Sequence, residues 1–302
     1  MNEYHNIETD LILEVSEGLT KNGKTLEGVY FKEEKIENGR VHVTDVEIRT
    51  ELGARQMGKP KGKYITLESG LLKENCGIDV CAETLSKYIK KLLPHKWNRI
   101  LAVGLGNREL TVDSLGPKVI DNLFMTYQDM EEGLCGLAPG VMAQTGMETA
   151  DIIKGVIDQT KPDAVIVIDA LAARSIHRLG TTIQLTNTGI TPGSGVGNHR
   201  NSLTESSLGI PVLAIGVPMI VRTSTIVYDT FSSIIEILQS KHTLRETGKR
   251  ISEFTVQEKY ELIQELLTPE VGNLCVTPKD IDELVFYIGK TVSRGINKAV
   301  YE

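Results

Sequence analysis

The sequence predicts an α/β protein whose mostly parallel sheet is doubly wound and flanked by helices, with a small β-rich subdomain at its N-terminus. From about residue 79, helical patterns alternate with short apolar strands rich in β-branched residues, which is typical of parallel strands buried on both faces. Before residue 76, strand patterns predominate. We therefore place the β-rich subdomain at residues 11–75 and the α/β domain at 76–302.

The N-terminal subdomain is predicted from one hairpin and one further strand. Residues 27–49 alternate apolar and polar side chains on either side of Asn38-Gly39. Asn-Gly suits a type I′ turn because both central residues need a positive φ. A basic, glycine-rich stretch follows at 53–64, and residues 64–69 then form a short apolar strand.

The larger domain is predicted from apolar periodicity. Residues 80–94 have helical spacing, and their late basic residues suit the negative end of a helix dipole. The later elements are strands at 99–107, 163–169, 181–185 and 211–217, and helices at 114–127, 147–160, 224–240, 256–267 and 278–300. Such a sheet binds ligands outside the carboxyl ends of its strands.

Composition narrows the class of partner. The chain has 33 Lys and Arg against 40 Asp and Glu, a net charge of −7, which argues against direct nucleic-acid binding through the overall field. The start is polar and acidic, and no run of about 18 apolar residues occurs. The four cysteines form no CxxC pair. We expect a cytoplasmic protein with reduced thiols and no membrane partner.

Two aspartates follow predicted strands. Asp169 comes directly after the apolar run 165–168, and Asp113 lies in the loop after strand 99–107. A desolvated carboxylate is costly unless it is used or paired. A salt bridge to Arg174 would explain Asp169, and a helix N-cap would explain Asp113.

The two carboxylates together suggest an alternative to these structural roles. Like charges a few ångströms apart raise one pKa and leave the other group ionised, which gives an acid and a base at neutral pH. Such a pair could activate water against an amide. HExxH, GxSxG and P-loop motifs are absent from the sequence.

Other candidate residues carry weaker signals. His177 could complete a metal site with the two acids, although a solvated histidine is the simpler explanation. Ser194 lies in a glycine-rich loop and would need His199 as its base. Gly104 and Gly106 suggest a dinucleotide fingerprint, but Glu109 replaces its third glycine.

Several long segments resemble the spore germination proteases of Bacillus and Clostridium relatives. The similarity runs in order over nearly the whole chain, through VGLGN (103–107), DSLGPKVIDNL (113–123), APGVMAQTGMETADII (138–153), IDALAARSI (168–176), GITPGSGVGN (189–198), LGIPVLAIGVP (208–218) and NLCVTPKDID (273–282). The linker at 240–255 is shorter than in the family. The resemblance implies a fold similar to the hydrogenase maturation peptidases, in which acids at these strand ends meet nickel.

The resemblance also implies an activity. The family degrades small acid-soluble spore proteins during germination, is made as a self-processing zymogen in the forespore, and is tetrameric. Its functional aspartates correspond to Asp113 and Asp169, with no cofactor. Asn107, Arg174 and Ser194 lie in the same motifs and could line the site.

The family cleaves Thr-Glu-(Phe/Ile)-Ala-Ser-Glu after the first Glu. TDLILE at 9–14 follows this pattern of acid, large apolar residue and acid. The resemblance therefore implies processing between Asp10 and Leu11, with residues 1–10 as a propeptide. That segment has three acids and no Lys or Arg, so it could lie against the basic stretch at 55–63. Two alternatives remain open: a metal-dependent peptidase of this fold, and a non-enzymatic dinucleotide-binding module.

Overall fold

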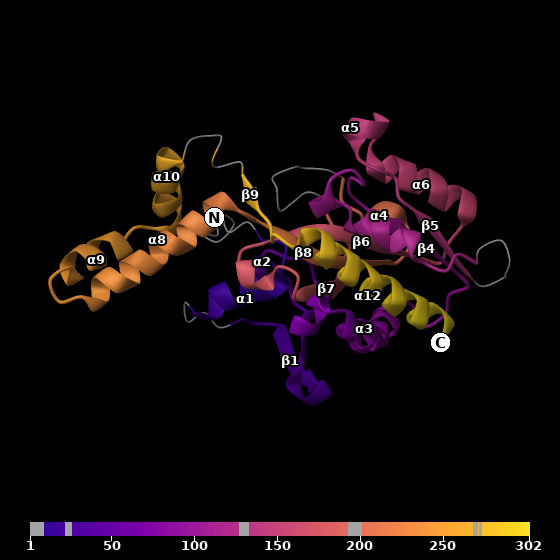
Figure 1. Cartoon of the computed structure of the whole chain (residues 1–302), viewed down its shortest axis with the longest axis horizontal. Coiled ribbons are helices and arrows are strands. Elements are labelled where there is room, and N and C mark those ends of the chain that lie inside the picture. The colour runs from indigo at the N-terminus through magenta and orange to yellow at the C-terminus, as the bar shows by residue number, and fades with distance from the viewer. Residues whose placement is uncertain (1–8, 22–25, 127–132, 193–200, 268–270, 272–273) are drawn as a thin grey trace.

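The computed structural model describes residues 9–21, 26–126, 133–192, 201–267, 271 and 274–302. Within these residues, nine strands form one mixed sheet in the order β1-β2-β3-β7-β8-β6-β4-β5, and β9 pairs with β8. Helices lie on both faces of this sheet (Figure 1). The predicted α/β class is therefore confirmed.

The strands are β1 (Val29–Ile36), β2 (Val41–Ile48), β3 (Gly62–Glu68), β4 (Arg99–Gly104), β5 (Gly133–Leu137), β6 (Ala164–Ala173), β7 (Thr182–Thr186), β8 (Val212–Arg222) and β9 (Cys275–Val276). The helices are α1 (Ile12–Lys21), α2 (Glu51–Met57), α3 (Ile78–Leu92), α4 (Leu115–Asp121), α5 (Met142–Thr145), α6 (Thr149–Thr160), α7 (Glu205–Leu208), α8 (Thr223–Ser240), α9 (Arg245–Ser252), α10 (Val256–Leu266) and α12 (Ile281–Tyr301).

The sheet is parallel in only one half. Strands β8, β6, β4 and β5 pair in parallel, whereas β1, β2, β3 and β7 pair antiparallel with each neighbour. The expectation of a mostly parallel sheet therefore holds for the β8–β5 half alone. The chain passes from β6 to β7 through residues 174–181, which is too short for the helical crossover that a return in the parallel direction needs.

The N-terminal hairpin turns at the predicted residues, with a longer loop than predicted. Asn38 and Gly39 have φ values of 56° and 83°, and Arg40 N donates to Glu37 O at 3.1 Å. Glu37 also has a positive φ, 53°, so the loop between the paired residues Ile36 and Val41 has four residues, whereas a type I′ hairpin loop has two. Strand β3 continues the hairpin and pairs with β7. The three N-terminal strands thus extend the main sheet, and the domain division after residue 75 stays a prediction.

Alternate residues of the central strands face two separate cores, as the pleat requires. Ile166 and Ile168 of β6 face the side covered by α3, α4 and α12. Val165 and Val167 face the side covered by α6. The connections after β4 and β5 thus leave the sheet on opposite faces, which opens a crevice between them at the carboxyl ends of the strands.

Strand β6 runs four residues beyond the predicted end at Asp169. It continues to Ala173 because β8 continues beside it, with Asp169 opposite Gly216 and Ala173 opposite Val221. Strand β4 stops earlier, with Gly104 opposite Ile168. Asp169 is consequently the first residue of β6 beyond the segment that pairs with β4. It lies inside β6, next to the carboxyl end of β4.

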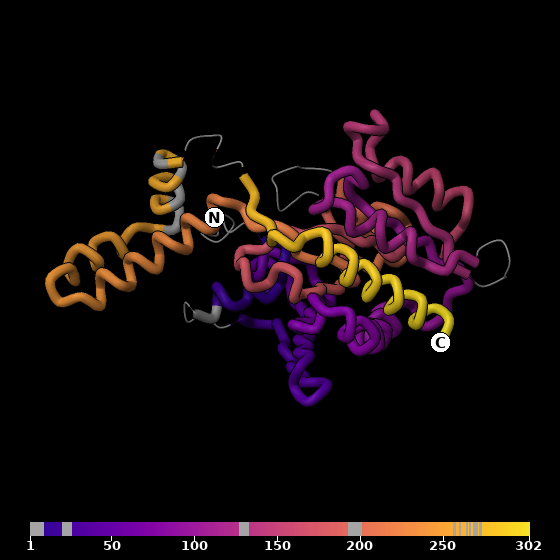
Figure 2. The backbone as a smooth tube through the Cα atoms, in the orientation of Figure 1, coloured from indigo at the N-terminus to yellow at the C-terminus, as the bar shows by residue number. Residues whose placement is uncertain are grey.

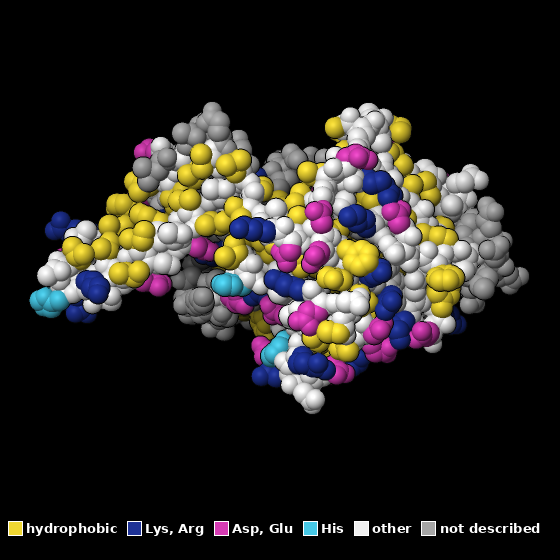
Figure 3. Space-filling view, in the orientation of Figure 1, with side chains coloured by type: hydrophobic (Ala, Val, Ile, Leu, Met, Phe, Trp, Pro, Cys, Tyr) yellow, Lys and Arg dark blue, Asp and Glu magenta, His cyan; other side chains and the backbone are white. Residues whose placement is uncertain are grey.

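Helices α8, α9 and α10 form an arm that projects from the body (Figure 2). Its surface carries many apolar side chains (Figure 3), including exposed Ile234, Ile237, Leu244 and Phe254. Helix α9 falls within the 240–255 linker, where no element was predicted. In the described part of the chain, no helix is both long and apolar enough to cross a membrane.

Candidate active site

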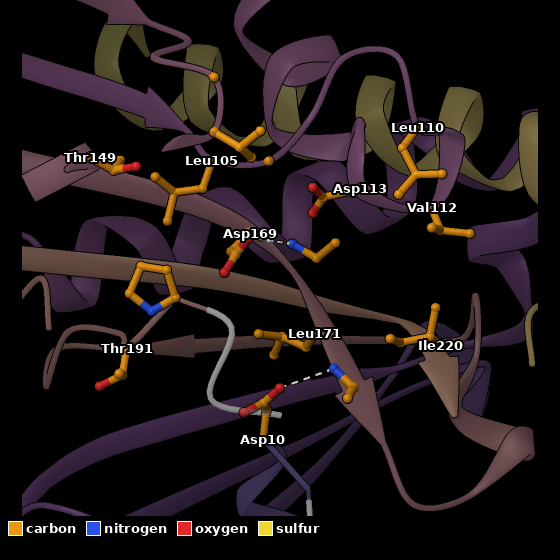
Figure 4. A pocket seen from close by; sticks show the side chains of 16 residues that line it. Asp10, Leu105, Leu110, Val112, Asp113, Thr149, Asp169, Leu171, Thr191 and Ile220 are labelled. Atoms are coloured by element: carbon orange, nitrogen blue, oxygen red, sulfur yellow. Dashed lines mark hydrogen bonds between the residues drawn. The ribbon is translucent and has the colours of Figure 1, made fainter. Parts of the chain in front are cut away.

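A pocket of about 250 Å³ lies at the carboxyl ends of β4 and β6. The loops after β4 and β5 form one side of it, and residues 169–172 of β6 form another. Asp113 and Asp169, the two acids selected from the sequence, both line this pocket. Figure 4 shows their carboxylates pointing into the same space.

Asp169 is held in a nearly dry position. Its side chain is 6% exposed, and Oδ1 accepts a hydrogen bond from Ala170 N at 3.0 Å. The salt bridge to Arg174 that could have explained this acid is not formed. The guanidinium of Arg174 pairs with Asp229 of α8, with Nε 3.0 Å from Oδ1, and Arg174 is not part of the pocket lining.

Asp113 is positioned by the loop that follows β4. It ends a short 3₁₀ turn, Thr111–Asp113, and Ser114 takes the N-cap position of α4. The carboxylate of Asp113 instead accepts from Asn107 N at 2.7 Å. The backbone N–H of Asn107 thus holds Asp113. Its side chain serves a different contact, because Asn107 Oδ1 accepts from Gln144 Nε2 at 2.8 Å and so ties the loop to α5.

The two glycines of VGLGN permit close packing around Asp113. Gly106 has φ +109°, and a Cβ there would lie 2.0 Å from Asp113 O. A Cβ on Gly104 would lie 2.2 Å from Gly116 O of α4. Both glycines are thus required by the approach of the loop and α4 to β4, which accounts for them without a dinucleotide.

A third carboxylate, Asp10, lines the same pocket. Asp10 N donates to Ala172 O at 3.1 Å, and Ala172 N donates to Asp10 Oδ2 at 3.0 Å (Figure 4). The next residue, Leu11, is fully buried in an apolar cluster with Leu171, Ala173, Leu179 and Val221. Of the predicted processing site, Asp10 thus lines the same pocket as the two predicted catalytic acids, and Leu11 lies in the adjoining apolar cluster.

Two further residues contact the carbonyl oxygen of Asp10. Lys59 Nζ and Gln184 Nε2 each lie 3.2 Å from it. Sequence reasoning noted the basic stretch that contains Lys59 but did not select this residue, and it missed Gln184. The available signal for Gln184 was one long polar side chain within the buried strand TIQLT, the same kind of signal that identified Asp169.

The segment after Leu11 is anchored by a buried acid. Glu14, 4% exposed, accepts from Arg174 N and Ser175 N at 2.8 Å each. Arg178 Nε lies 3.5 Å from Glu14 Oε1, and Thr9 Oγ1 also donates to Glu14. These contacts fix both sides of the Asp10–Leu11 bond relative to β6.

The remaining sequence candidates do not join this group. His177 is exposed, and Ser194 and His199 lie outside the described residues. Among the residues that the structure describes, no three His, Cys, Asp or Glu side chains are arranged to hold a metal ion. The described residues therefore do not provide the His177 metal site considered from the sequence.

Comparison with known proteins gives concordant matches. A family model described as germination protease matches residues 6–256. Germination proteases of Caldanaerobacter subterraneus, Clostridium perfringens and Bacillus subtilis are 46%, 39% and 37% identical, covering 97%, 98% and 98% of this chain and 94%, 95% and 94% of their own lengths. These matches confirm the resemblance inferred from the motifs.

A search of solved structures finds a NiFe hydrogenase maturation protease from Thermococcus kodakarensis. It is 18% identical, with a TM-score of 0.31 over 57% of this chain and 98% of its own.

Proposed function

The chain belongs to the germination protease family and is a protease of spore germination. On this premise, we propose that the chain is made as a zymogen, processes itself, and then hydrolyses small acid-soluble spore proteins. The proposal places the enzyme in the cytoplasm of the forespore and spore core. It also makes the enzyme a homotetramer that needs no cofactor.

The proposed chemistry is hydrolysis by water held between Asp113 and Asp169. One carboxylate takes a proton from the water as its oxygen attacks the peptide carbonyl carbon, and the other, protonated, gives a proton to the leaving nitrogen. The observation that carries this proposal is that both acids point into one pocket (Figure 4). We assign the roles of base and acid to the pair and not to either residue alone.

The proposed cleavage follows an acid in a sequence like Thr-Glu-(Phe/Ile)-Ala-Ser-Glu, and self-processing falls between Asp10 and Leu11. The support is spatial, because Asp10 lines the pocket of the two catalytic acids. The backbone amide of Ala172 binds its carboxylate. While residues 1–10 remain attached, Asp10 occupies the place that a substrate acid needs, which keeps the zymogen inactive toward other proteins.

The test uses the purified chain and a peptide containing Thr-Glu-Ile-Ala-Ser-Glu, with mass spectrometry of the peptide and of the chain's own N-terminus. Wild-type protein should cut the peptide after its first Glu and lose residues 1–10. Asp113→Asn and Asp169→Asn should remain folded and lose activity by about 10²–10⁴-fold. Asp158→Asn, on the exposed face of α6, is the matched control. Near-normal turnover in either site variant would refute the aspartate pair.

Exhaustive chelation separates this proposal from the metal-dependent alternative. Cleavage run by two carboxylates is unchanged by chelator, whereas cleavage that stops on chelation and returns with added metal assigns the chemistry to a metal site.

A further inference from the structure

We propose that Lys59 and Gln184 form the oxyanion hole of this protease, donating hydrogen bonds to the carbonyl oxygen of the residue before the cut. The inference rests on the proposed cleavage between Asp10 and Leu11. It assigns a catalytic role to Gln184, on β7, and to Lys59, on the connection between α2 and β3. Neither residue lies on β6, the strand that carries Asp169.

Gln184 holds the chain on both sides of the bond to be cut. Its Nε2 donates to Asp10 O at 3.2 Å, and its Oε1 accepts from Ile12 N at 2.7 Å. Because both ends of the amide are engaged, its orientation is fixed. The side chain is 6% exposed, so its donor is directed by the protein rather than by water.

Lys59 brings a positive charge to the same oxygen. Its Nζ lies 3.2 Å from Asp10 O and 3.4 Å from Thr9 O. Gly58, in the left-handed conformation with φ 60°, ends α2 immediately before it. Burial lowers the pKa of the Lys59 ammonium, and the nearby Asp10 carboxylate opposes that shift.

The opposite side of Asp10 is held by β6. Asp10 N and Oδ2 bond with the backbone of Ala172, so the residue is fixed between β6 on one side and Gln184 with Lys59 on the other. Asp10 also lines two adjoining pockets, one shared with Asp113 and Asp169 and the other with Lys59 and Gln184. Asp10 therefore lines the pocket of the two acids, and its carbonyl oxygen contacts Lys59 and Gln184.

This arrangement suits the charge that develops during hydrolysis. The water oxygen forms a bond to the carbonyl carbon of Asp10, and the carbonyl electron pair moves to its oxygen as an oxyanion. Collapse of this intermediate breaks the bond to Leu11 N, which leaves as an amine with the proton transferred through the aspartate pair. Lys59 and Gln184 stabilise the oxyanion more than the neutral carbonyl, which lowers the barrier.

A purely structural role for Lys59, balancing the Asp10 carboxylate, predicts a different pH dependence. If the ammonium is catalytic, the rate falls as pH rises through the pKa of Lys59, which burial lowers from its ordinary value. A guanidinium stays protonated over this range. Lys59→Arg should therefore retain its rate at alkaline pH, where the wild-type rate declines.

The experiment measures the first-order loss of residues 1–10 by intact-mass spectrometry of full-length protein from pH 6 to about 10. Lys59→Met and Gln184→Glu should each slow processing by about 10²–10³-fold. Gln184→Glu keeps an acceptor for Ile12 N, replaces the NH₂ donor by a carboxylate oxygen and places a negative charge beside the developing oxyanion. Lys61→Met, which removes a nearby exposed lysine paired with Glu51, is the matched control and should leave the rate unchanged.

The outcomes separate this inference from the proposed function. If folded Lys59→Met and Gln184→Glu process at the control rate while Asp169→Asn is inactive, the oxyanion hole is refuted and the aspartate mechanism stands. If wild-type protein is not cut between residues 10 and 11, the proposed processing fails and this inference fails with it. If Lys59→Met does not fold, Gln184→Glu and the pH profile of Lys59→Arg decide the question.

Discussion

Glu14→Gln should release the segment that carries the proposed processing site, without changing the size of side chain 14. The Glu14 carboxylate accepts two backbone N–H groups at 2.8 Å each and lies beside Arg178. A glutamine can accept from one of these amides, but its own NH₂ must then face the other N–H. The substitution therefore removes one charge-assisted hydrogen bond, weakens the second, and leaves Arg178 with less compensation.

The cost can be worked from these contacts. A hydrogen bond to a charged group contributes about 1.5–3 kcal/mol, and a neutral one about 1 kcal/mol. The loss at this 4% exposed side chain should thus reach about 2–4 kcal/mol in the docking free energy of residues 9–21. Since 1.36 kcal/mol is tenfold, the docking equilibrium shifts by about 30- to 900-fold. Self-processing should slow by at least about tenfold.

Glu17→Gln is the matched control, because it makes the same chemical change at another partner of Arg178. Glu17 is 53% exposed and Oε1 lies 2.6 Å from Arg178 Nη2, so its loss should cost no more than about 1 kcal/mol. Intact-mass kinetics report processing, and hydrogen exchange of residues 11–21 reports docking. Equal processing and equal exchange in the two variants would refute the anchoring role of Glu14.

Two further predictions follow from single positions. Gly106→Ala should displace Asp113 and abolish cleavage, because the new Cβ would lie 2.0 Å from Asp113 O. Gly146 also has a positive φ, but nothing lies within 4 Å of a Cβ there, so Gly146→Ala should lower the free energy of unfolding by only about 1–2 kcal/mol and keep activity. Cleavage assays and melting temperatures of both variants test this. Cys81, fully buried and with its thiol pKa raised by burial to about 11, should react with a thiol reagent at pH 8 only after unfolding, and rapid labelling of native Cys81 would contradict its placement.

Local chemistry made part of the site predictable. Asp169 could be identified because a carboxylate directly after four β-branched residues needs a reason to be there. The position of the turn at Asn38-Gly39 could be identified because positive φ values there depend on these two adjacent residues. In both cases the determining interaction lies within a few residues of chain. Asp113 could be selected in the same way, as an acid in the loop after a predicted strand, and the resemblance then added Asp10 and Leu11 as functional positions.

Contacts between distant segments were beyond such reasoning. Lys59 and Gln184 meet Asp10 across 49 and 174 residues of chain, and the pairing of β3 with β7 places the connection that carries Lys59 near Gln184. Arg174 shows the same limit, because its partner Asp229 is 55 residues away. Asp169 is the acid nearer to Arg174 in the sequence, but in the folded chain Arg174 pairs with Asp229.

Elements without strong intrinsic signals were also missed. Strand β5, GLCGL, contains two glycines, which disfavour strands. It forms because β4 offers a free parallel edge, with Arg99 opposite Gly133. Helix α1 was not predicted either, and it is held by tertiary contacts: Ile12 is fully buried and Leu19 is 3% exposed.

The burial of α1 also bears on what the proposed cleavage would leave behind. On the carboxyl side of the cut, Leu11 and Ile12 have no exposed surface, so their side chains would stay packed in their clusters, while the new amino group of Leu11 would need water or a new polar partner. On the amino side, Asp10 is held by polar contacts to Ala172, Lys59 and Gln184, and water or an incoming substrate can satisfy these groups once the peptide has left. Release of residues 1–10 would therefore expose these donors to an incoming acidic residue, so one set of contacts would both block the zymogen and select an acid before the cut.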